Sequence, residues 1–323
     1  MVITSKTRDL LLKVKVPGSS GFSSGLKNIG EVENKGFELA INATPIEGDF
    51  TWNTSLNLTY NKNKVLDLGD VSFIYPSQPG QDETGIHLGR IIQVGQPLGT
   101  FYGYVYDGLF STTDDIASSA QPTAKPGDIR FKDLNGDGVI NSEDRDFVGS
   151  PLPDCSMGLT LGFNYKNFDI SAFFQGVFGN EVYNLTNYLG EFYNQAQYNK
   201  NSTILDAWRP DHTNTDIPRV TLDDPNNNIR PSTYYIHNAS FVRLKNLKIG
   251  YTLPDRITSK LKLKRTYIYL QGQNLFTITG YNGIDPEVGL QSYSSENRNL
   301  DMGVDRGVYP LPRTFTLGVN VNF

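Results

Sequence analysis

The sequence has no long apolar run, which excludes a membrane-spanning helix. Such a helix needs roughly 18 or more consecutive apolar residues, whereas polar residues interrupt every apolar stretch of the 323-residue chain, and the mean hydropathy is -0.38. A basic cluster is also absent, and the formal net charge is -5. We therefore expect no nucleic-acid partner.

Cysteine is nearly absent too. Cys155 stands alone, so no disulfide can form within the chain, and no base lies nearby in sequence to activate the thiol. Residues 1–6 lack the basic start and apolar core of a signal peptide. Either the protein is cytosolic or the chain starts within a longer protein, and the strand pattern favours the second.

Aromatic residues and glycine are abundant, with 18 Tyr, 18 Phe and 31 Gly. Aromatic and β-branched residues that alternate with small polar ones favour strands. The last eleven residues form the clearest strand, and from Phe315 onward every second residue is apolar. Its apolar face holds Phe315, Leu317, Val319, Val321 and Phe323.

The segment 157–178 predicts a hairpin with a two-residue turn at Lys166-Asn167. In that register one face is apolar and the other is mostly small and polar, with Phe173 as the exception. The apolar cross-strand pairs are Tyr165 with Phe168, Phe163 with Ile170, Leu161 with Ala172 and Leu159 with Phe174. Such faces suit a barrel with lipid outside and water inside, but a soluble sandwich shows the same period.

The lengths of the connections separate these two folds. We expect ten strands, at 8–16, 36–45, 50–66, 86–94, 99–110, 156–166, 167–178, 239–252, 264–276 and 311–323. Short turns are expected near 46–49, 95–98, 166–167 and 253–263, and they alternate with long loops near 17–35, 67–85, 111–155, 179–238 and 277–310. Outer-membrane barrels have short periplasmic turns and long extracellular loops, and structureless loops this long are uncommon in compact soluble domains. This alternation of short and long connections predicts an all-β, antiparallel transmembrane β-barrel segment.

One expected strand changes phase. In 239–252, Val242 and Leu244 share a face, but Leu247 and Ile249 are shifted by one residue. A β-bulge near Lys245-Asn246 would restore a single apolar face, and the alternative is a strand register that ends there.

One segment, 133–144, has the spacing of a calcium-binding loop. Oxygen-bearing side chains occupy positions 1, 3, 5, 9 and 12, a glycine that permits a sharp turn occupies position 6, and position 7 offers a backbone carbonyl. The expected Ca²⁺ ligands are Asp133, Asn135, Asp137, Val139 through its carbonyl, Asn141 and Asp144. Asp144 stands where an EF-hand has Glu, as in the dockerin variant of the loop, and the alternative is an ordinary Asp/Asn/Gly turn without an ion.

No catalytic site is expected, and we interpret the chain as not an enzyme. The three histidines, His87, His212 and His237, lie far apart without metal-ligand spacing. Acidic pairs such as Asp114-Asp115 and Asp223-Asp224 fall in polar loops and are expected to be turn residues. The loop aromatics Tyr234, Tyr235 and Tyr293 are expected to pack within loops or at the membrane interface, and the alternative is that they stack on sugars.

Several stretches together resemble the SusC/RagA-type TonB-dependent outer-membrane transporters of Bacteroidetes. Beside the 133–144 loop they are Thr7–Leu12, Gly30–Gly36, Phe101–Gly108, Trp208–Asp211, Thr213–Arg219, Phe241–Leu247, Gly272–Thr277 and Pro310–Phe315. The resemblance implies a barrel of about 22 strands with an N-terminal plug. It also implies import of an oligosaccharide or peptide, a SusD-like surface lipoprotein as partner, and energy from the TonB complex.

On this resemblance, residues 1–323 form the C-terminal part of the barrel, in contact with outer-membrane lipid and without the plug domain. Two alternatives stay open. One is a self-contained outer-membrane porin, since ten strands is a permitted number. The other is a secreted, calcium-dependent glycan-binding β-protein whose apolar faces pack against each other.

Overall fold

The computed structural model describes residues 1–15, 19, 21, 24–75, 89–191, 199–289 and 302–322. Within these ranges no helix is both long and apolar enough to cross a membrane. His87, Tyr293 and Phe323 lie outside the described residues.

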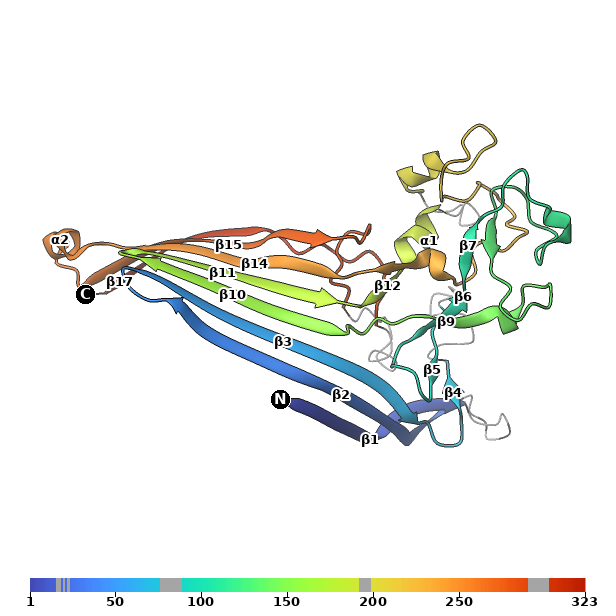
Figure 1. The fold of residues 1–323 in the computed structure, drawn as a ribbon, viewed down its shortest axis with the longest axis horizontal. Coiled ribbons are helices and arrows are strands. Elements are labelled where there is room, and N and C mark those ends of the chain that lie inside the picture. Colours follow the sequence, from blue (N-terminus) through green and yellow to red (C-terminus); the bar gives the residue numbers. More distant parts are fainter. Residues whose placement is uncertain are drawn as a thin grey trace.

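Eight long strands form one open, twisted sheet (Figure 1). All neighbouring strands are antiparallel. In order across the sheet they are β1 (Val2–Lys15), β2 (Ser24–Ile46), β3 (Phe50–Asp67), β10 (Cys155–Tyr165), β11 (Phe168–Phe178), β14 (Phe241–Thr252), β15 (Arg265–Thr279) and β17 (Thr314–Asn322). In the described part of the chain β1 and β17 are the two edges and do not pair with each other, so these strands do not close a barrel.

Short connections gather at one end of the sheet and long ones at the other (Figure 1). The turn end carries 47–49, 166–167 and the segment 253–264, which contains α2 (Asp255–Thr258) and η6 (Ser259–Leu261). At the opposite end, the described residues of 68–154, 179–240 and 280–313 form what we call the loop lobe. The expected alternation of short and long connections is therefore confirmed for these segments.

The loop lobe contains only short elements. Its strands are β4 (Phe73–Ile74), β5 (Ile92–Gln93), β6 (Phe101–Tyr104), β7 (Tyr106–Leu109), β8 (Ile129–Phe131), β9 (Arg145–Gly149), β12 (Glu181–Asn184), β13 (Ile236–Asn238) and β16 (Val304–Asp305). Its helical turns are η2 (Ile116–Ser118), η3 (Ser142–Asp144), α1 (Leu185–Glu191), η4 (Ser202–Asp206) and η5 (Thr233–Tyr235).

Two local predictions are confirmed. Strands β10 and β11 pair in the expected register around the turn at Lys166-Asn167, from Tyr165 opposite Phe168 outward. The bulge in β14 is present as well, since the ladders on both sides of the strand skip Lys245. The extra residue returns the later apolar side chains of β14 to the face occupied by the earlier ones.

The expected number of ten sheet strands is wrong, because the described residues contribute eight strands to the sheet. The expected strands 86–94 and 99–110 are wrong: their described parts form β5, β6 and β7, which pair inside the loop lobe with β4, β9 and β8. The physical reason is that Phe101 is fully buried in the core of the lobe. In the large sheet, by contrast, side chains alternate between the apolar face and the polar face. The turn expected at 95–98 consequently lies in the lobe and not at the turn end.

The long loop expected at 17–35 is also wrong, since β2 begins at Ser24 and pairs with β1 from there to Phe37. Residues 27–36 are rich in Lys, Glu and Asn and show no apolar face. They therefore gave no strand signal in the sequence, although the backbone ladder is continuous apart from its bulges.

The two faces of the sheet differ sharply in chemistry. A row across the apolar face joins paired residues from seven strands: Leu317, Leu270, Ile249, Ile170, Phe163, Trp52 and Ile46. The adjacent row on the polar face reads Thr316, Gln271, Lys248, Ser171, Gly162 and Asn53. Leu317 is 74% exposed, so the apolar face is not covered by a second layer there.

A smaller buried cluster joins Val32 of β2 and Val65 of β3 to Ile92 of β5, whereas the main buried core lies in the loop lobe. Its largest fully buried side chains include Tyr183, Tyr235 and Phe101, which belong to one cluster with Ile129 and Phe131 of β8. The aromatic rings contact one another, with Tyr183 and Tyr235 5.5 Å apart between ring centroids. This core supports the segment that leads into the 133–144 loop.

Candidate calcium-binding loop and its setting

The 133–144 loop connects β8 to β9 in the loop lobe and ends in the 3-10 turn η3. Gly136 and Gly138 have φ of +74° and +81°, a conformation that side-chain-bearing residues rarely adopt. No atom lies within 4 Å of where a Cβ would stand on either glycine. The two glycines are therefore required by the backbone conformation and not by lack of space.

The first and last expected ligands hold the loop backbone. The Asp133 carboxylate accepts hydrogen bonds from the amides of Gly136 at 2.7 Å and Gly138 at 2.8 Å. Asp144 is fully buried, and its two oxygens accept from the amides of Leu134 at 2.9 Å and Asn141 at 2.7 Å. Asp144 thus ties the start of the loop to its end.

The four middle ligands converge. The amide nitrogens of Asn135 and Asn141 donate to Asp137 Oδ2 at 3.0 and 3.2 Å, and Asn141 Nδ2 lies 3.4 Å from the Val139 carbonyl oxygen. Hydrogen bonding lowers the pKa of Asp137, chiefly from the Val139 amide and then from Asn135. The Asp137 carboxylate is consequently charged at neutral pH.

These residues fit a cation only in part. Rotating an Asn amide by 180° exchanges its nitrogen and oxygen, which would turn an oxygen toward the Asp137 carboxylate. In the described part of the chain no three His, Cys, Asp or Glu side chains lie where they could share one ion, so a cation would also need amide and carbonyl oxygens. Calcium accepts such mixed oxygen sets. The six ligands stay a prediction.

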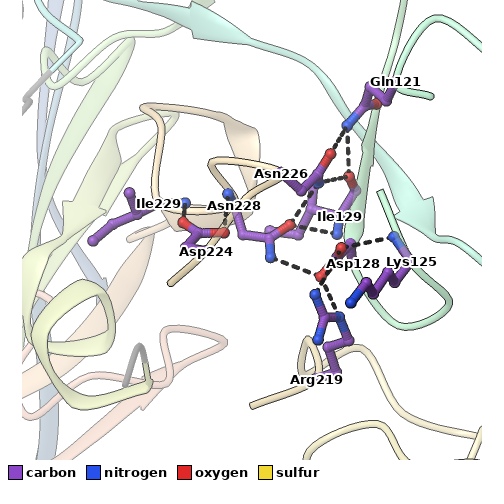
Figure 2. Close-up of polar contacts among 9 residues, drawn as sticks. All are labelled: Gln121, Lys125, Asp128, Ile129, Arg219, Asp224, Asn226, Asn228 and Ile229. Carbon is purple, nitrogen blue, oxygen red and sulfur yellow. Dashed lines mark hydrogen bonds and ion pairs between the residues drawn. The ribbon is translucent and has the colours of Figure 1, made fainter. Parts of the chain in front are cut away.

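A buried polar network fixes β8, the strand that enters the loop (Figure 2). Asp128 is fully buried, and its carboxylate forms two contacts with the Arg219 guanidinium, Nε to Oδ1 at 2.6 Å and Nη2 to Oδ2 at 3.1 Å. Such bidentate pairs are strong and geometrically specific. This pair joins two loop segments that are 91 residues apart in sequence.

Side-chain amides complete the hydrogen bonding of β8 (Figure 2). The Ile129 amide donates to Asn228 Oδ1 at 2.8 Å, and the Ile129 carbonyl accepts from Asn226 at 2.8 Å and from Gln121 at 3.0 Å. The Phe131 amide donates to Gln121 Oε1 at 2.7 Å. Strand β7 pairs with one side of β8. Buried backbone groups without partners are costly, so these side-chain amides take the place of a second neighbouring strand on the other side.

The acidic residue Asp224 has a structural role in the same network. Its carboxylate accepts hydrogen bonds from the amides of Asn228 and Ile229. Burial raises the pKa of Asp224, while these two hydrogen bonds oppose the rise. Sequence reasoning missed the network, although Arg219 lies in a stretch that resembles the transporter family.

The remaining candidates are not brought together into a site. His212 contacts Asp206 at 2.7 Å, and His237 lies apart from it in β13. The loop tyrosines pack as expected: Tyr235 is fully buried in the lobe core, and the Tyr234 hydroxyl donates to Glu191 at 2.9 Å.

Comparisons with known proteins match the whole chain to part of larger receptors. It is 40% identical over 328 residues to TonB-dependent receptor P3 of Formosa agariphila, covering 99% of this chain and 32% of that protein. It is 34% identical to TonB-dependent receptor SusC of Bacteroides thetaiotaomicron, covering 98% of this chain and 29% of that protein. No family model matches the chain.

The solved structure of the RagAB peptide transporter is similar in fold. The TM-score is 0.78 at 25% sequence identity, and the match covers 99% of this chain and 32% of that chain. The resemblance to SusC/RagA-type TonB-dependent receptors is confirmed. The fold class, an antiparallel β-barrel segment, is confirmed with it, and the chain spans about a third of the length of the relatives it matches.

Proposed function

We propose that this chain is part of an outer-membrane receptor that imports an oligosaccharide or a peptide with energy from the TonB complex. The observation that carries the proposal is the similarity to TonB-dependent receptors over 99% of the chain. These relatives are receptors and transporters, not enzymes.

The exposed apolar face supports an outer-membrane location. Leu317 and Phe315 of β17 are 74% and 70% exposed, and they continue an apolar surface that crosses the sheet. Monomeric soluble proteins rarely expose contiguous apolar patches larger than a few hundred Å². In the membrane, lipid covers this face, while the polar face lines the inside of the barrel.

The described fold does not favour either alternative. A self-contained porin needs a closed sheet, whereas β1 and β17 do not pair in the described part of the chain. A secreted glycan-binding sandwich needs its apolar faces packed together, whereas a single sheet layer leaves the apolar face of β17 exposed (Figure 1).

We further propose that the loop lobe is extracellular. It would lie beside a SusD-like surface lipoprotein that captures the substrate first, while the TonB complex acts through the part of the receptor outside this chain. Ca²⁺ bound by Asp133, Asn135, Asp137, Val139, Asn141 and Asp144 would stiffen the lobe. The support is the loop spacing together with the convergence of its four middle ligands.

Uptake by living cells tests this function. The complete gene that encodes this chain is deleted, and cells are offered labelled oligosaccharides or peptides one at a time. We expect uptake of one class to be lost, to return with the gene, and to stop when TonB is removed. Uptake that continues without TonB, or recovery of the gene product outside the outer membrane, would contradict the proposal.

A further inference from the structure

Near the loop lobe, the outward surface of β2 and β3 changes from apolar to aromatic and then to basic. The outward pairs Ile41–Leu56 and Leu39–Leu58 are apolar. The next pair is aromatic, with the rings of Phe37 and Tyr60 stacked at 5.6 Å between centroids. Aromatic girdles of this kind mark the membrane–water interface in β-barrels.

Two rows of charged residues lie beyond this aromatic pair on the same face. Lys35 is paired with Lys62 and Glu33 with Lys64, while Lys6 of β1 lies opposite Glu33. Since residues two apart on a strand share a face, all five point the same way as Phe37 and Tyr60. We call Lys6, Lys35, Lys62 and Lys64 the lysine cluster.

The lysine cluster has an excess of positive charge. Glu33 is the one acid within its two rows, and its carboxylate lies 2.9 Å from Lys35 Nζ and 3.9 Å from Lys6 Nζ. Neither Lys62 nor Lys64 forms an ion pair with any described residue, and the Lys62 ammonium lies 6.0 Å from the centre of the Tyr60 ring. Four lysines against one glutamate leave three positive charges in the two rows.

The acids gather one row further from the apolar face. Glu31 is paired with Asp67 there, and its carboxylate lies 3.5 Å from Arg8 and 3.9 Å from Lys6 of the cluster. The positive excess is therefore confined to the level next to the aromatic pair. In a chain with a formal net charge of -5, this local excess does not follow from the overall charge.

We propose that the lysine cluster binds the phosphate groups of an anionic glycolipid in the outer leaflet of the outer membrane. The inference rests on the proposed membrane location and adds to it a binding site and a ligand chemistry. Two features select this occupant. The cluster continues the face that would meet acyl chains, and its charge complements phosphate.

The side chains suit this role physically. A lysine extends its apolar stem along an apolar surface while the ammonium reaches the polar interface, so Lys35 and Lys62 can lie over the aromatic pair and still reach a headgroup. Each lysine close to an anionic membrane surface changes affinity about fivefold. The two lysines of the first row together should contribute roughly 25-fold.

The test uses the complete gene product in phosphatidylcholine nanodiscs. The discs contain either phosphorylated lipid A or the same lipid A after its phosphates are removed, and retained lipid A is counted by native mass spectrometry. We expect wild-type protein to retain the phosphorylated form preferentially. K35Q/K62Q should lose that preference by roughly 25-fold, and high salt should weaken it.

A matched control removes two lysines from the turn end. Lys166 lies 5.2 Å from the centre of the Tyr165 ring, and Lys262 is in the turn before β15. K166Q/K262Q removes the same charge and should retain phosphorylated lipid A as wild type does. If K35Q/K62Q and wild type retain it equally, or if wild type does not distinguish the two lipids, the lysine cluster is not the binding site.

Failure of this inference can be distinguished from failure of the proposed function. Folded protein recovered in the outer-membrane fraction, with no preference for phosphorylated lipid A, overturns this inference alone. Protein absent from that fraction overturns the proposed function as well.

Discussion

Arg219 and Asp128 form a bidentate ion pair between two loop segments, and this pair holds β8 in place beside the calcium-type loop (Figure 2). The Asp128 side chain is completely buried, and the Arg219 side chain is 19% exposed. The pair also lies next to a tight contact: Gly127 has φ of +86°, and a Cβ there would collide with the Trp208 ring. Two stretches that resemble the transporter family, around Trp208 and Arg219, thus have a structural role in assembling the lobe.

Removing Arg219 should destabilise the loop lobe strongly. R219Q leaves the buried Asp128 carboxylate without its cation, which costs about 3 kcal/mol for a buried pair. Limited proteolysis of the complete receptor should show faster cleavage within the lobe. R209Q is the control, because Arg209 pairs with Asp211 at the surface and its loss should cost less than about 1 kcal/mol.

A double variant checks that the effect comes from the pair. D128N/R219Q removes both charges, so the loss of stability should be smaller than the sum of the two single losses. Additive losses would show that the two residues act independently.

Asp137 should be needed for calcium affinity. D137N removes a charged ligand and should weaken Ca²⁺ binding by at least about tenfold in titration calorimetry of the complete receptor. V139A should bind normally, because residue 139 contributes only its carbonyl, and D146N should too, because Asp146 lies outside the loop. Equal affinity of D137N and wild type would remove Asp137 from the ligand set.

The pKa of Asp137 predicts how this affinity depends on pH. The pKa is lowered by hydrogen bonds from the Val139 amide and from Asn135, so the carboxylate stays ionised below the usual range for Asp. Mild acidification should therefore leave this ligand ionised, and protonation of Asp137 should weaken Ca²⁺ binding only when the pH passes below that range. Calorimetry at several pH values measures this.

Positions 319 and 320 should report different environments. Val319 is paired with Ile268 on the apolar face and Asn320 with Tyr267 on the polar face. V319R should destabilise the reconstituted receptor by about 2 kcal/mol, the lower part of the range for lipid-facing sites, because the site is near the turn end. N320R should cost less.

Spin labels distinguish lipid from a dry protein core at these positions. A label at 319 should be broadened by a lipid-soluble relaxation agent, and one at 320 by a water-soluble agent if the barrel interior is open there. Protection of position 319 from the lipid-soluble agent would overturn its assignment to lipid.

His237 should make the lobe sensitive to acid. Burial lowers the pKa of His237 below its usual 6.5, so the folded state holds the ring neutral while the unfolded state takes up a proton. The contribution of neutral His237 to the free energy of unfolding is fully present above about pH 6.5. It is lost as the pH drops from there toward the pKa of the folded state. H237F should reduce this pH dependence in thermal unfolding.

Local sequence patterns were sufficient to predict the two-faced strands, the β10–β11 hairpin with its register, the bulge at Lys245 and most of the alternation of short and long connections. These follow from local rules: side chains alternate along a strand, and a one-residue shift exchanges the faces. The position of β5, β6 and β7 outside the sheet could not be predicted in this way, because burial of Phe101 depends on a core built from segments distant in sequence. Likewise, only the register between β1, β2 and β3 places Lys6, Lys35, Lys62 and Lys64 on one surface. Along the chain these lysines are separated by acids and amides, and strand pairing brings their charges together.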